Sequence, residues 1–134
     1  MERAMIPRYR AWDKKFKEMV QVDALVFEEQ IIKATYKNGN VAKEDLKNYV
    51  LMQSTGLRDK NGREIFEGDI LKVTNLSSWL EVVSFNEDKA MFVSKETKRE
   101  VEETPLYDLF NTDIFEVEII GNIHTNPKLA EVKQ

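Results

Sequence analysis

The 134 residues have a mass of 15.7 kDa and a formal net charge of -4, with 42% of them hydrophobic and 33% charged. Because such a chain can bury roughly two-thirds of its unfolded surface, we expect one soluble globular domain with a single core, which excludes a disordered protein. The absence of cysteine excludes disulfides, thiolate zinc sites and thiol nucleophiles, and no apolar run approaches the roughly 20 residues that span a bilayer.

The first predicted element is a β-hairpin. Residues 9–12 and 19–22 have the composition of two short strands, with a charged turn between them that begins at Asp13. Pro7 precedes the first strand, a position that suits strand entry or a sheet edge. We expect Trp12 to be a core or cap residue of this hairpin; the alternative is an exposed aromatic that stacks a nucleic-acid base.

Residues 23–35 have an ambiguous pattern of apolar residues. They fit either one helix capped by Asp23 or two strands broken at residues 28–29, and we favour the strands. A turn follows at residues 38–40. Residues 41–49 are mostly good helix formers but too few for an independent helix, so we expect a single helical turn or a loop there.

The central residues 51–73 predict a strand, a hairpin and a second strand. Residues 59–62, Asp-Lys-Asn-Gly, are a strong turn signal, because Gly62 tolerates a positive φ and the Asp59 side chain can bond the backbone two residues on. Residues 67–69 give a second turn before the last strand of this stretch.

A further hairpin is predicted after a loop at residues 75–78. Its strands are residues 79–85 and 90–93, which are rich in β-formers and flank a polar turn at residues 86–89. Residues 95–103 are polar and charged, so we expect an exposed strand or a loop there.

The C-terminal part is predicted to contain a short helix and a long strand. Pro105 at a first helical position indicates a helix over residues 104–110. Residues 114–123 alternate well enough for a strand, with Gly121 marking a bulge or bend. Residues 128–134 form a polar tail with room for one helical turn.

These elements predict an α+β fold, mainly antiparallel β, in the form of a small barrel-like sheet with one or two short helices. No linker divides the chain, so we expect a single domain over residues 1–134. The N-terminus lacks the apolar core of a signal peptide, and we therefore expect a cytoplasmic protein with no membrane association.

Candidate catalytic residues are few. His124 is the only histidine, so a zinc site built from several His or Cys ligands is not expected, and we place His124 on the surface. Glu67 and Asp69 could meet a cation or act as an acid/base pair, but we favour a structural role in which Asp69 bonds backbone amides around Gly68. No nucleophile elbow surrounds any serine that could join the histidine: Ser54, Ser77, Ser78, Ser84 or Ser94.

No phosphate-binding glycine loop is present, because Gly56 and Gly62 do not fit the known patterns, and no cofactor is expected. A small β protein can bind nucleic acid through basic and aromatic side chains on one face, although the acidic pI of about 5.2 argues against it here. The residues that could do so are Arg8, Arg10, Trp12, Arg58 and Lys60.

Charge is unevenly distributed along the chain. From Arg3 to Lys17 there are six basic residues and one acidic residue, whereas residues 100–118 contain seven acidic residues and no basic one. Opposite segments of this kind can join copies head to tail, and solvated faces explain them equally well. The leading hypothesis is therefore a non-enzymatic protein that binds another protein or itself, with nucleic-acid binding as the alternative.

Three stretches together resemble the YopX family of bacteriophage and prophage proteins. They are Tyr-Arg-Ala-Trp-Asp at residues 9–13, the central residues 51–71, and Ile-Ile-Gly-Asn-Ile-His at residues 119–124 with Asn-Pro at 126–127. The resemblance spans almost the whole chain. It implies a phage-encoded cytoplasmic protein of mainly β structure, in a family of uncharacterised role, and it brings no catalytic residues.

Overall fold

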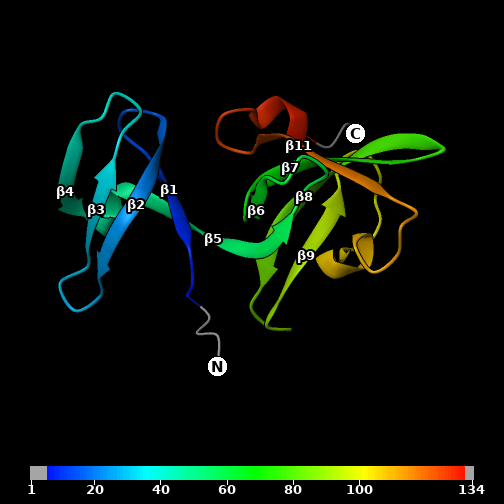
Figure 1. Ribbon diagram of the computed structural model, residues 1–134, viewed down its shortest axis with the longest axis horizontal. Helices are drawn as coiled ribbons and strands as arrows, with labels where there is room; N and C mark the ends of the chain where they lie inside the picture. Colours follow the sequence, from blue (N-terminus) through cyan, green and yellow to red (C-terminus); the bar gives the residue numbers. More distant parts are fainter. Residues whose placement is uncertain (1–5, 132–134) are drawn as a thin grey trace. The chain divides into compact units, whose positions relative to one another are not determined.

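Antiparallel strands dominate the chain, as the sequence predicted (Figure 1). The computed structural model describes residues 6–131, which divide into two units, unit 1 up to Ser54 and unit 2 from Thr55. The boundary falls inside strand β5 (Tyr49–Arg58), so no linker marks it in the sequence. Each unit has its own buried apolar cluster where a single core was expected. The prediction of one domain stays a prediction, because units that share a strand can still unfold together.

Unit 1 is a sheet of antiparallel strands in the order β4-β3-β2-β1-β5. Alternation along β1 buries Ala11 and Asp13 on the inner face, where Ala11 lies opposite Val20 of β2 and Leu51 of β5. The buried cluster of this face is Ala11, Val20, Ile32, Ala34 and Tyr49. The elements of unit 1 are β1 (Tyr9–Asp13), β2 (Glu18–Val26), β3 (Ile31–Thr35), β4 (Val41–Asp45), the 3-10 helix η1 (Leu46–Asn48) and the first part of β5.

Unit 2 contains a second sheet in the order β10-β9-β8-β7-β11, and β6 lies beside β5. Its cluster is larger and more aliphatic, with Ile65, Leu71, Val73, Val83, Leu106, Leu109, Val117 and Ile119 all buried. The elements of unit 2 are β6 (Glu64–Phe66), β7 (Asp69–Asn75), β8 (Ser77–Asn86), β9 (Met91–Glu96), β10 (Thr104–Pro105), η2 (Leu106–Leu109), β11 (Glu116–Asn122) and η3 (Pro127–Ala130).

Several predicted features are confirmed by strand pairing. β1 pairs with β2 and β8 with β9, as the two predicted hairpins require. The register of β11 against β7 shifts between Ile119 and Gly121, which is the predicted bulge. Residues 23–35 form strands rather than a helix, since β2 continues to Val26 and β3 begins at Ile31.

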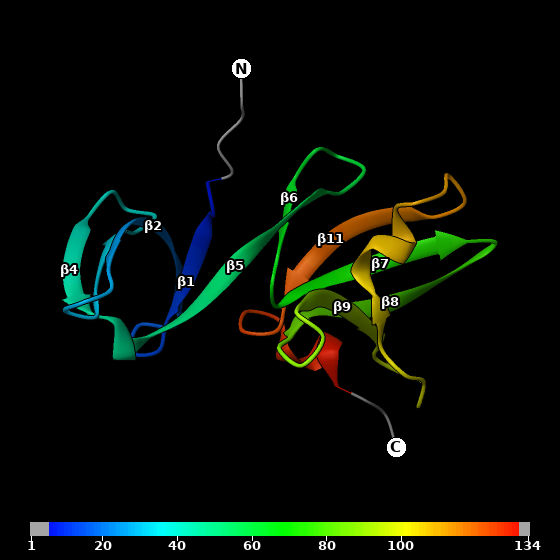
Figure 2. The same ribbon diagram turned by 90° about the horizontal axis from the view of Figure 1, so that it is seen from below.

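The predicted barrel-like sheet is wrong. Among the described strands the two sheets stay open, because β4 ends the sheet of unit 1 and β10 and β11 end the second sheet without pairing to each other (Figure 2). The predicted helix over residues 104–110 is a 3-10 turn, η2, that buries Leu106 and Leu109. The helices of the described part are all 3-10 turns of three or four residues, and none could cross a membrane.

Two loop predictions also need correction. Residues 41–45 form strand β4, because pairing with β3 overrides the helical propensity of this short segment, whereas residues 46–48 form the expected helical turn, η1. Residues 75–78 are a tight hairpin turn, since β7 reaches Asn75, Leu76 takes a φ of 61°, and β8 starts at Ser77. Arg3 of the predicted basic segment lies outside the described residues, and so do residues 132–134 of the predicted polar tail.

Candidate functional site

The five residues proposed for nucleic-acid binding divide between the two units. Arg10 and Trp12 lie on the face of β1 opposite the buried Ala11 and Asp13, so they share one face, as the sequence predicted. Arg8 is exposed and immediately precedes this strand, and its carbonyl accepts from the Ser54 amide.

Arg58 and Lys60 lie at the tip of the central hairpin in unit 2. The Arg58 guanidinium donates from Nη1 to the Gly62 carbonyl at 2.8 Å. The Lys60 Nζ lies 3.8 Å from Glu116 Oε2 on β11. Lys60 therefore has an acidic neighbour in its own unit, whereas Arg58 keeps its full charge beside a neutral carbonyl.

Asp69, one of the two carboxylates considered for acid/base chemistry, has a structural role. It is buried, and its Oδ2 accepts from the Phe66 amide at 2.8 Å. Gly68, at a φ of 85°, donates its amide to Val83 and completes the turn between β6 and β7. The preference for a turn-fixing aspartate is thus confirmed.

Asp59 organises the central turn as predicted. Its Oδ1 accepts from the amides of Asn61 and Arg63, and its Oδ2 accepts from the Ile119 amide at 3.0 Å, sixty residues along the chain. Burial alone would raise the pKa of Asp59, but these hydrogen bonds and the nearby Arg63 charge outweigh burial and hold the pKa below its ordinary value. The carboxylate therefore joins the hairpin to β11.

A second buried aspartate organises one end of unit 1. Asp13 Oδ1 accepts from the amides of Lys15 and Phe16, and Oδ2 accepts from the Tyr36 hydroxyl at 2.5 Å. The Tyr36 hydroxyl lies 2.7 Å from that of Tyr49. Burial and the hydrogen bond to Asp13 raise the pKa of Tyr36 far above its usual range, and burial raises the pKa of Tyr49 as well. Burial would also raise the pKa of Asp13, yet its three hydrogen bonds prevail and lower it.

A surface hollow of about 610 Å³ lies beside this network, and we call it the Phe16 hollow. Its apolar lining includes Phe16 and Val41, residues that are 65% and 69% exposed. Glu18 and Glu44 also line the hollow and give it negative charge. Large exposed apolar side chains that meet at one concavity are typical of a surface that a partner covers.

Strand β4 forms an edge of the sheet of unit 1 (Figure 2). Its residues Val41, Ala42 and Glu44 line the Phe16 hollow. Tyr36 N donates to Asn40 O, and Leu46 N donates to Gln30 O. These two bonds determine which residues of β4 form backbone hydrogen bonds with β3, because bonded and non-bonded residue pairs alternate along an antiparallel ladder. It follows that Ala42 and Glu44 direct their backbone groups at β3. The backbone groups of the intervening residues, Val41, Lys43 and Asp45, point away from the sheet.

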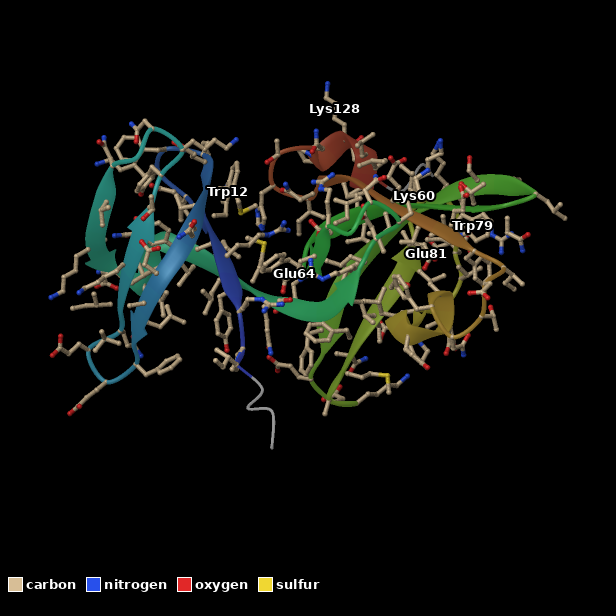
Figure 3. The ribbon with its side chains drawn as sticks, viewed as in Figure 1. Trp12, Lys60, Glu64, Trp79, Glu81 and Lys128 are labelled. Carbon is tan, nitrogen blue, oxygen red and sulfur yellow. The ribbon has the colours of Figure 1, made fainter. Side chains whose placement is uncertain are left out.

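Unit 2 has a pocket of about 310 Å³ that we call the Glu81 pocket. Glu81 is 6% exposed, and its carboxylate accepts from the Ser94 hydroxyl at 2.6 Å and from the Trp79 indole N–H at 2.8 Å (Figure 3). The pocket is also lined by Phe115, whose ring meets that of Trp79 edge to face, with centroids 6.1 Å apart.

Neither the hollow nor the pocket was predicted from the sequence. One available signal was the alternation Trp79-Leu80-Glu81-Val82-Val83, which puts a carboxylate on the same strand face as a tryptophan and a core valine. Nothing in the local sequence signals the Phe16 hollow, because Phe16 lies in a turn and Val41 lies in a segment without strand character.

Comparison with known proteins gives a family and a fold. The model of the family described as YopX protein matches residues 8–131. The crystal structure of protein EF1440 from Enterococcus faecalis is similar, with a TM-score of 0.60 and 28% sequence identity over 96% of this chain and 100% of that one. No curated protein matches the chain.

Proposed function

The chain belongs to the YopX family, and on that premise we propose that it is a non-enzymatic phage accessory protein that binds a segment of another protein at the Phe16 hollow. The observation that carries the proposal is the convergence of two highly exposed apolar side chains, Phe16 and Val41, on one hollow beside an edge strand. An extended segment could add to β4 as a new strand and place its side chains in the hollow.

The chemistry of the hollow specifies the partner segment. Glu18 and Glu44 line it, so the segment carries a basic residue as well as an apolar one. Lys43, whose backbone faces outward, is a residue type that discourages indiscriminate strand pairing at a sheet edge. Specificity then comes from the side chains that enter the hollow, whereas backbone hydrogen bonds supply a part of the affinity that is independent of sequence.

Support for a role without catalysis comes from the carboxylates of the central hairpin. Asp59 accepts three hydrogen bonds from backbone amides and Asp69 accepts one, so both carboxylates hold turns of the fold. A general base needs its lone pair within reach of a substrate proton.

Affinity capture from phage-infected bacterial cells tests this function. The wild-type protein is compared with a double variant, Phe16→Ser with Val41→Thr, and with the control Phe27→Ser. Phe27 is 71% exposed in the same unit but does not line the hollow. We expect proteins retained by the wild type and the control to be lost with the double variant. Equal retention by all three, or none by any, contradicts the proposal.

Two further measurements define the partner. Hydrogen exchange on the captured complex is expected to protect the outward amides of Val41, Lys43 and Asp45, which were assigned to the free edge above. Light scattering at high concentration shows whether a second copy of the chain is the occupant, because a strict monomer removes self-association.

Nucleic-acid binding is the second candidate, favoured by the shared face of Arg10 and Trp12 on β1. Titration with single-stranded DNA and with RNA at two salt concentrations decides it, since phosphate contacts weaken steeply as salt rises. Binding at low salt that falls in a Trp12→Ala variant supports this candidate, and no binding at low salt removes it.

A further inference from the structure

The Glu81 carboxylate has an unusual set of partners for a buried acid. Its two hydrogen bonds come from neutral donors, the hydroxyl of Ser94 and the indole N–H of Trp79. No ion pair joins it to a cation of the described residues. Buried carboxylates are normally paired with a cation, because removing a charge from water is costly. Each of its two oxygens accepts one of these hydrogen bonds and has a second lone pair. The carboxylate can therefore accept a further hydrogen bond from a ligand.

The walls of the pocket suit an organic cation. Trp79 and Phe115 contribute aromatic surface, and the ring faces of such side chains attract ammonium and guanidinium groups. Trp79 is fixed by its hydrogen bond to Glu81 and by its edge-to-face contact with Phe115. The aromatic surface is thus held in place before a ligand arrives, which reduces the entropy lost on binding.

The remaining charged residues of the pocket are mostly acidic. Glu96, Glu102 and Asp108 line it together with Arg99, the one cation among the described residues of the lining. Arg99 Nη2 lies 3.4 Å from Glu96 Oε2, so this cation pairs with one acid and leaves the others to raise the local concentration of positive ligands.

We propose that the Glu81 pocket binds an organic cation: an ammonium or guanidinium group on a short apolar chain. The cationic group donates to the Glu81 carboxylate, and the apolar chain lies against Trp79 and Phe115. At about 310 Å³ the pocket has room for a ligand of that size. The proposal is independent of the Phe16 hollow, because it concerns different residues in the other unit.

A structural role for Glu81 is the competing explanation. In that case the carboxylate only ties Ser94 of β9 to Trp79 of β8. The substitution Glu81→Gln separates the two explanations, since the amide oxygen can still accept from the Trp79 indole while its NH2 donates to the Ser94 hydroxyl. We expect this variant to keep the fold and to lose the charge.

The test is a titration of the 15N-labelled protein with n-butylammonium and with n-butylguanidinium, followed by the indole N–H signal of Trp79. A Trp12→Phe variant assigns that signal, because the chain has two tryptophans. We expect a saturable shift of the Trp79 signal and no shift with butanol, which has a similar apolar chain but no charge. In Glu81→Gln the affinity falls by about tenfold or more, as expected when a buried charge partner is removed.

Three controls keep the result decisive. Glu118→Gln removes a carboxylate of β11 that does not line the pocket, and it is expected to leave the affinity unchanged. Phe115→Leu removes an aromatic wall without touching the hydrogen bonds of Glu81, and it is expected to weaken binding by about threefold or more. Arg99→Gln removes the competing cation and is expected to strengthen binding.

The source of the cation is resolved by a parallel titration with the peptide acetyl-Ala-Lys-Ala-amide and its arginine counterpart. Tighter binding of a peptide than of n-butylammonium identifies a basic side chain of a protein as the ligand, and the reverse identifies a free amine. The proposal is overturned if neither amine nor peptide shifts the Trp79 signal, or if folded Glu81→Gln binds them as well as the wild type does.

Discussion

In unit 1, Asp13 accepts hydrogen bonds from the amides of the turn that follows it, and in unit 2, Asp59 does the same. The second carboxylate oxygen is used differently. Asp13 accepts there from the Tyr36 hydroxyl, whereas Asp59 accepts from the Ile119 amide on β11. One residue type thus fixes a local turn in both units, while the long-range partner is a side chain in one unit and the backbone in the other.

The clusters beside the two aspartates differ as well. The cluster of unit 1 contains two alanines and a tyrosine among its five buried residues, whereas that of unit 2 contains eight buried aliphatic residues. Because burial of apolar area is the main stabilising term, unit 1 depends more on its polar network than unit 2 does. Four predictions test this comparison.

Asp59→Ala is expected to have the largest effect. It leaves three backbone amides without their acceptor, so the free energy of unfolding should fall by about 3 kcal/mol or more. Urea denaturation followed by circular dichroism measures the change. Asp59→Asn, which keeps one oxygen for the turn amides, should lose less; equal loss in both variants would show that the long-range bond to Ile119 dominates.

Tyr36→Phe is expected to destabilise unit 1 by about 1–3 kcal/mol, because Asp13 and Tyr49 both lose their hydroxyl partner. Tyr49→Phe is the matched control. It leaves the hydrogen bond from Tyr36 to Asp13 in place and should cost about 1 kcal/mol by the same reasoning. Equal stability of the two variants, measured by urea denaturation, would contradict a central role for Tyr36.

The pH dependence of the free energy of unfolding should differ between the two units. Asp13 and Asp59 have lowered pKa values in the folded protein, so the stability that they contribute is present above the ordinary carboxyl pKa of 3.8 and is lost as the pH falls below it. Tyr36 and Tyr49 have raised pKa values, so their contribution is present below the ordinary value of 10.0 and is lost as the pH rises above it.

A loss of stability at alkaline pH is therefore expected in unit 1, and a loss of stability at acid pH is expected in both units. Unfolding curves recorded from pH 2 to pH 11 check this. Tyr36→Phe should reduce the loss of stability at alkaline pH, and Asp59→Asn should reduce only the loss at acid pH. If Tyr36→Phe loses as much stability at alkaline pH as the wild type does, the loss belongs to other groups.

The smallest effect is expected at two turn glycines, Gly39 of unit 1 and Gly62 of unit 2. Both have a positive φ, 88° and 79°, and an added Cβ would meet no atom within 4 Å. Backbone strain alone then sets the cost of Gly→Ala, about 1 kcal/mol at each position. Thermal unfolding compares the two variants, and a much larger loss at either position would show that the turn does more than reverse the chain.

The local sequence determined most of the turns and most of the strands. Asp59 and Gly62 specify the central turn through an Asx hydrogen bond and a positive φ, both of which depend on residues close in sequence. The family was also predicted from three stretches of sequence, and the family model confirms it. Strand β4 was missed, because residues 41–45 become a strand only through pairing with β3.

The tertiary structure alone decided how the chain divides and where its concave surfaces lie. Val41 lines a hollow with Phe16, and Glu81 lines a pocket with Phe115, although each pair is separated by more than twenty residues in the sequence. Hydrogen bonds between near neighbours follow from residue type, whereas a hollow depends on which distant strands pair and in which register. For that reason the turns could be predicted from the sequence, and both candidate binding sites could not.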